Sequence, residues 1–126
     1  MTAEQLSAYR KRIRVLVKQM DRLSSRCLFP DPLIRGTPVE VMRTCGKQSC
    51  KCMKDPKDRH GPYKVISVVR NGKQRPIALS KDKAELWALA QHYQFQVAKL
   101  SELKKTSAEL WDVVWEVIER RLQQFP

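Results

Sequence analysis

The chain has 126 residues, of which 42% are hydrophobic, enough for one folded domain with a core of moderate size. It carries 25 lysines and arginines against 13 aspartates and glutamates, a formal net charge of +12 that exceeds what solubility requires and is typical of proteins that bind polyanions. No run of about eighteen apolar residues occurs, so we expect no membrane-spanning helix and a cytoplasmic location.

The surplus positive charge lies in one part of the sequence. Residues 1–80 contain 18 lysines and arginines and 6 acidic residues, whereas residues 81–126 contain 7 of each. An interface with an anionic partner is therefore expected in the first two thirds of the chain.

The N-terminal residues predict a helix that ends near residue 28. Thr2 and Gln5 have the spacing of a capping box, in which each side chain bonds a backbone N–H of the other. The apolar residues are then three and four apart, which is the spacing of a coiled-coil seam. They are Leu6, Tyr9, Ile13, Leu16, Met20 and Leu23.

The remaining positions of this helix are strongly basic. From Arg10 to Arg26, seven cations stand against one acid, Asp21, so they repel one another unless an anionic partner is near. We expect Arg10, Arg14 and Lys18 to be part of a nucleic-acid-binding surface. A solvated outer face is the alternative.

Prolines between Phe29 and Pro38 end the helix, and three short strands follow. Residues 39–43, 63–69 and 74–79 are the strand candidates, and Asn71-Gly72 is a strong signal for a two-residue hairpin turn between the last two. Pro76 cannot donate to a ladder, which predicts an edge strand. The expected sheet is three-stranded and antiparallel.

Cys45, Cys50, Cys52 and His60 predict a metal site at one end of this sheet. Three thiols and an imidazole are the ligands of a closed, structural zinc site, and Gly46 allows the backbone to turn after the first ligand. The alternatives are a disulfide framework, free thiols or another metal; an iron–sulfur cluster would need a fourth thiol, for which only Cys27 is left. The absence of an apolar signal segment argues against disulfides.

The motif Cys-Gly-Lys-x-x-Cys-x-Cys followed by His-Gly-Pro-Tyr also resembles a family of small zinc-knuckle and β-hairpin proteins of undefined biochemistry. These bacterial proteins are often encoded beside transposases and other mobile-element genes. The resemblance is detailed from about Gly36 to Ser80, with Lys47-Gln48 where the family has Lys-Pro. It implies a mobile-element setting rather than a mechanism.

The C-terminal residues predict a second helix from Asp82 to Gln124, with Ser80 as its N-cap. One heptad phase runs through the segment, which favours a single helix; Thr106-Ser107-Ala108-Glu109 resembles a capping box and would start a second one. We expect the stretch from Leu86 to Leu103 to pair with the N-terminal helix. The apolar residues beyond it would then be free for another chain and a homo-oligomer: Leu110, Trp111, Val114, Val117 and Ile118.

Together these features predict an α+β protein that folds as a single unit. A basic N-terminal helix (residues 1–28) and a long, coiled-coil-like C-terminal helical segment (81–126) flank a zinc-clamped, three-stranded head (36–80).

No catalytic constellation is visible, so an enzyme is not expected. The expected function is binding of DNA or RNA as an accessory protein of a mobile genetic element. The alternative is a scaffolding subunit whose heptad helices join a larger mobile-element protein. The cations expected to contact phosphates in the head are Lys47, Lys51, Lys54, Arg70, Lys73 and Arg75.

Overall fold

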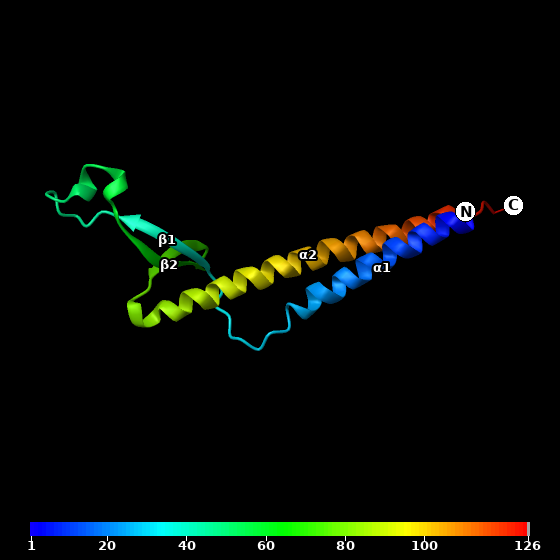
Figure 1. Cartoon of the computed structure of the whole chain (residues 1–126), viewed down its shortest axis with the longest axis horizontal. Coiled ribbons are helices and arrows are strands. Elements are labelled where there is room, and N and C mark those ends of the chain that lie inside the picture. The colour runs from blue at the N-terminus through cyan, green and yellow to red at the C-terminus, as the bar shows by residue number, and fades with distance from the viewer. Residues whose placement is uncertain (126) are drawn as a thin grey trace. The chain divides into compact units, whose positions relative to one another are not determined.

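The computed structural model describes residues 1–125, which form two compact units. The helix-pair unit contains Met1–Pro30 and the described residues from Gln96 onward, and the sheet unit contains Asp31–Phe95. The predicted combination of an N-terminal helix, a three-stranded antiparallel sheet and a long C-terminal helix is confirmed (Figure 1). None of the helices in the described part of the chain is long and apolar enough to cross a membrane.

Helix α1 (Ala3–Ser25) begins with the predicted capping box. The amide of Gln5 donates to the Thr2 hydroxyl at 3.1 Å, and the Thr2 amide donates to the Gln5 side chain at 3.0 Å. The predicted seam is the less exposed face of the helix, since Leu16 and Leu23 are buried and the other four members are half-buried.

Helix α2 (Ala84–Arg121) is continuous, so the prediction of one long helix is confirmed. Thr106 does not cap a second helix: it is buried, and its hydroxyl donates to the Glu102 carbonyl one turn earlier. Ser80 precedes a short 3-10 turn, η3 (Lys81–Lys83), and its hydroxyl donates to Asp82 rather than capping the backbone.

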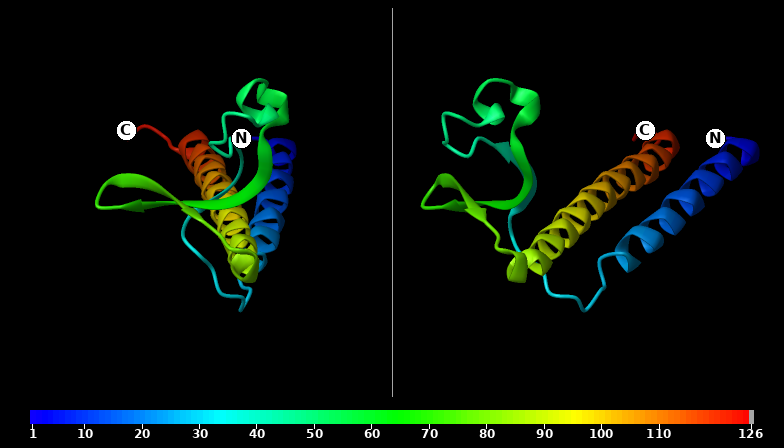
Figure 2. Two further views of the ribbon diagram at one scale, coloured as in Figure 1. Left: turned by 90° about the vertical axis from the view of Figure 1, so that its left-hand side faces the viewer. Right: turned by 60° about the vertical axis from the view of Figure 1, so that its left-hand side comes forward.

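The two helices of the helix-pair unit run antiparallel and side by side (Figures 1 and 2). The Tyr9 hydroxyl donates to the Glu116 carboxylate at 2.8 Å, and Arg12 forms an ion pair with Glu109. The expected pairing of α1 with Leu86–Leu103 is therefore wrong for most of that stretch. The end of α1 lies beside Leu100 and Leu103, and the rest of α1 pairs with the residues of α2 beyond them.

The apolar residues of α2 that were expected to be free for another chain fall into two groups, one facing α1 and one exposed. Leu110 and Val117 are half-buried, whereas Trp111, Val114 and Ile118 remain exposed. The second group is the one still available for another molecule.

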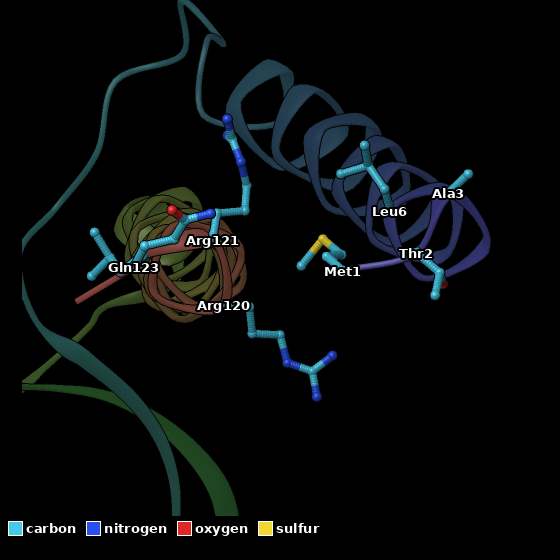
Figure 3. A pocket seen from close by; sticks show the side chains of 8 residues that line it. Met1, Thr2, Ala3, Leu6, Arg120, Arg121 and Gln123 are labelled. Carbon is cyan, nitrogen blue, oxygen red and sulfur yellow. The ribbon is translucent and has the colours of Figure 1, made fainter. Parts of the chain in front are cut away.

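The start of α1 lies beside the end of α2 (Figure 3). A hollow of about 490 Å³ lies there between the start of α1 and the end of α2, and Met1, Leu6 and Arg120 are among its lining residues. The Arg120 guanidinium lies 5.7 Å from the centre of the Tyr9 ring, a cation–π contact that joins the two helices.

The sheet has the order β1-β2-β3, with β1 (Thr37–Arg43), β2 (His60–Arg70) and β3 (Lys73–Ala78). The Asn71-Gly72 turn between β2 and β3 has φ angles of 52° and 74°, as the predicted hairpin requires. Pro76 lies on the edge strand, also as predicted.

The beginning of α2 packs on this sheet, which explains why it does not pair with α1. The Trp87 indole donates to the Val39 carbonyl at 3.4 Å, and the Gln94 amide donates to the Gly36 carbonyl at 2.8 Å. The Lys64 ammonium lies 5.0 Å from the centre of the Trp87 ring. The buried apolar residues of the sheet and of the start of α2 are Val65, Ile66 and Ala90; Cys52 is also buried, in the loop between β1 and β2.

Candidate metal centre

The four predicted ligands are brought together by the loop between β1 and β2. Cys45 follows β1, Cys50 and Cys52 flank the start of a 3-10 turn, η1 (Lys51–Met53), and His60 is the first residue of β2. The loop reverses direction at Gly46, whose φ of +80° favours glycine, as expected from the sequence.

The four ligand atoms lie close enough together to hold one metal ion. All four lie within 4.8 Å of one another, with 3.6 Å between the sulfurs of Cys45 and Cys52 and 3.3 Å between Cys50 Sγ and His60 Nε2. Tetrahedral zinc with its usual bond lengths would separate such atoms by about 3.5–3.8 Å. The four residues can therefore hold a metal ion.

The other cysteine does not belong to this cluster. Cys27 is part of the helix-pair unit, where its thiol donates to the Leu23 carbonyl at 3.5 Å. No disulfide links the four cysteines, all of which lie in the described part of the chain. The candidate centre thus has three sulfur ligands and one nitrogen ligand.

Backbone hydrogen bonds hold the loop in shape around the ligands. The Cys45 amide donates to Cys52 Sγ at 3.4 Å, and the Met53 amide donates to the Cys50 carbonyl at 3.1 Å. A second 3-10 turn, η2 (Pro56–Asp58), is capped by Asp55, whose carboxylate accepts from the Lys57 amide at 3.0 Å. These bonds shape the loop that carries the three cysteines, and strand β2 supplies His60.

Gly61 is a positioning residue that we did not predict from the sequence. Its φ is +135°, and a Cβ atom there would lie 2.8 Å from the Val41 carbonyl oxygen and 2.9 Å from Met42 Sδ. The close approach lies at the irregular pairing between β1 and β2 and sets the position of His60. The His-Gly-Pro-Tyr motif was the available signal, but the need for glycine arises from the partner strand.

The thiols already differ in acidity without a metal. Hydrogen bonds from the Cys52 backbone and from the Cys52, His60 and Cys45 side chains lower the pKa of Cys50 to about 6. The Cys45 amide lowers the pKa of Cys52, but burial and the neighbouring Cys50 and Cys45 sulfurs outweigh it, so that this pKa is raised. Cys50 is therefore the ligand most readily present as a thiolate.

The nine predicted cationic contact residues fall into three groups, and all are exposed. One group lies in the loop between β1 and β2 (residues 44–59), called the metal loop below. A second group surrounds the turn of the β2–β3 hairpin (Figure 2). Arg70 and Lys73 are paired in register on either side of that turn. Arg10, Arg14 and Lys18 form a row on α1, four residues apart. Among residues 1–125, none of these nine cations forms an ion pair.

The comparisons with known proteins identify a family for the chain. None of the curated proteins and none of the solved structures matches it. A family model described as "Domain of unknown function (DUF6788)" matches residues 6–87, which is more than half of the chain and includes all four clustered ligands. The chain therefore belongs to the DUF6788 family.

Proposed function

We propose that this chain is a nucleic-acid-binding protein whose basic head is stabilised by a structural zinc ion. The observation that carries the proposal is the charge of the sheet unit. Residues 31–95 contain 13 lysines and arginines and 6 acidic residues, and the cations of the metal loop and hairpin turn have no acidic partner among the described residues.

Zinc is the metal that suits the donor set. Three thiolates and one imidazole, here within 4.8 Å of one another, are typical of structural zinc sites, whereas iron–sulfur clusters generally use four thiolates. With four protein ligands, zinc has no open position at which to activate water. Its role would be to hold the loop in shape, and we propose no enzymatic activity.

The exposed lysines and arginines of the metal loop and the hairpin turn are suited to binding the phosphates of a nucleic acid. Each lysine or arginine placed near a phosphate releases condensed counterions, so affinity grows with the number of phosphates neutralised. Arg70 and Lys73 flank a two-residue turn at the end of the β2–β3 hairpin, and a two-stranded ribbon can enter a major groove. This hairpin turn is our proposed contact surface, with the metal loop and α1 supplying further phosphate contacts.

The test is the salt dependence of binding to a labelled DNA duplex and to a structured RNA. Replacing Lys73 and Arg75 with Glu should weaken binding and reduce the slope of log K against log salt by about 2, one for each phosphate that the variant no longer neutralises. The matched control replaces Lys105 and Arg121, two exposed cations of α2 outside the sheet unit, with Glu and should change the slope little.

Two results would contradict this assignment. Absence of binding to either nucleic acid at low salt would overturn the function itself. Binding that survives the hairpin change but disappears when Arg10, Arg14 and Lys18 are replaced with Glu would assign the contact to α1 instead.

We further propose an accessory role in a mobile genetic element, which rests on the family resemblance. A scaffolding role is the second candidate, in which the helices join a larger protein of the same element. The observation that favours scaffolding is the exposed apolar surface of α2, where Trp111 is 72% exposed. Mass in solution with and without nucleic acid separates the two roles.

A further inference from the structure

Helix α2 carries two parallel stripes in the helix-pair unit. The first stripe faces α1, and its members are half-buried or buried: Lys99, Leu103, Thr106, Leu110, Val113 and Val117. The second stripe consists of the residue that follows each of these, and all its members are exposed: Leu100, Lys104, Ser107, Trp111, Val114 and Ile118. One residue is a rotation of about 100° around a helix, so the second stripe lies a quarter turn away from α1.

The second stripe is apolar enough to need a partner. Leu100 is 57% exposed, Trp111 72%, and Val114 and Ile118 40% each. Two neighbouring hollows, of about 410 and 720 Å³, lie along it and share Ser107 in their lining. The larger one is also lined by α1, through Val17, Met20, Asp21 and Ser24. The small side chain of Ser107 thus leaves a depression one turn before the large, protruding Trp111.

Helix α1 has no matching stripe of its own. The residues that follow its seam by one position include Arg10, Arg14 and Asp21, with Val17 as the apolar exception. Within the helix-pair unit, the second stripe of α2 is therefore the surface with the three-and-four spacing of a coiled-coil seam that has no partner. The partner must offer an apolar stripe with the same spacing.

We propose that a second copy of this chain covers this stripe, with the two α2 helices antiparallel and related by a two-fold axis near residue 109. Positions that add up to 218 then face each other across the axis. Trp111 lies over Ser107 of the second copy, Leu100 faces its Ile118, and Lys104 lies along its Val114. Large side chains meet small ones, and the aliphatic part of each lysine covers an apolar neighbour.

A parallel pairing lacks this complementarity. It would place Lys104 against Lys104 and Trp111 against Trp111, which sets two like charges and two bulky rings in the same layers. The two-fold antiparallel arrangement is therefore the one that the stripe favours.

The stripe from Leu100 to Ile118 is about 27 Å long, and one helix is about 10 Å wide. The product, about 270 Å² for each copy, is below the roughly 800 Å² that standard interfaces bury on each side, so we expect a weak, concentration-dependent dimer.

Sedimentation equilibrium of the zinc-loaded full chain at several concentrations tests the proposal. We expect a dimer, with Trp111→Glu and Ile118→Glu each shifting the dissociation constant upward by at least tenfold. Because both side chains are substantially exposed, circular dichroism should show unchanged helix content in these variants. The matched control, Lys105→Glu, changes an exposed residue on the opposite side of α2 and should leave the dimer intact.

Cysteine cross-linking in a Cys27→Ser background tests the antiparallel register. A chain with Ser107→Cys mixed with a chain with Trp111→Cys should give the mixed disulfide in preference to either homodimeric one. A monomeric wild-type chain, a dimer insensitive to both glutamates, or preferential 107–107 and 111–111 linkage would each overturn the proposal. The outcome is independent of the proposed nucleic-acid function, since a monomer can still bind phosphates.

Discussion

The two units of this chain are stabilised by different interactions. The helix-pair unit has a continuous apolar seam, in which Leu16 is fully buried and Leu23 nearly so. The sheet unit has three short strands, a small core around Val65 and Ile66, and a loop shaped by four clustered metal ligands. Because each unit has its own stabilising interactions, we expect the two units to unfold separately. Removing the metal should unfold the sheet unit, and removing a side chain of the seam should unfold the helix pair.

Loss of the metal should have the largest effect. Structural zinc contributes of the order of 10 kcal/mol in small metal-dependent domains, because binding and folding of the loop are coupled. Cys50→Ser should abolish binding of one zinc per chain, measured by elemental analysis. Hydrogen exchange should then show loss of protection in β1 and β2 and retained protection in α1.

The matched control is Cys27→Ser, because Cys27 lies outside the ligand cluster and should keep the metal. Equal loss of protection in α1 and β2 on removal of the metal would show that the two units are not independent.

Lowering the pH should also remove the metal, and should do so gradually. Metal ligands bind as thiolate and neutral imidazole, so affinity falls as pH falls. The pKa of Cys50 is lowered to about 6, so the thiolate contribution is fully present above its ordinary pKa and is lost as pH falls through about 6. Zinc release followed with a chromophoric chelator should therefore increase progressively as the pH falls below 6; release that increases toward alkaline pH would contradict the assigned ligands.

The stability of the helix pair should depend on the apolar residues of its seam and not on the metal. Leu16→Ala should destabilise this unit by about 2–5 kcal/mol because it leaves a cavity at a fully buried position. Val15→Ala is the matched control, since Val15 is 52% exposed and its change should cost little. Thermal unfolding followed by circular dichroism measures both, and an equal effect of the two changes would refute the antiparallel seam.

The smallest expected effect is at Gly46 and Gly61, the glycines that follow the ligands Cys45 and His60. Gly61→Ala should weaken zinc binding by about 1–3 kcal/mol. The new Cβ would press on the β1 backbone, and alanine would also be strained at this backbone conformation. Gly46→Ala should cost only about 1 kcal/mol, since Gly46 has a positive φ but open space around it. Competition for zinc with a chelator of known affinity ranks the two; a tighter-binding Gly61→Ala variant would contradict the close contact.

The features that could be predicted from the sequence are those specified by residues close together along the chain. The capping box at Thr2, the turn at Asn71-Gly72 and the four ligands are each specified within about sixteen residues, and all three are found in the structure. The partner of α1 was not predictable in this way, because both halves of α2 carry apolar residues at heptad spacing. The choice depended on the sheet, which packs against Trp87 and the residues around it.

The most direct test of the central claim, that a metal-held head makes the nucleic-acid contact, is binding to a DNA duplex before and after zinc removal. We predict that a chelator abolishes most of the affinity and that added zinc restores both the affinity and its salt dependence, while helix content changes little throughout. Unchanged affinity and salt slope in the zinc-free protein would contradict the claim.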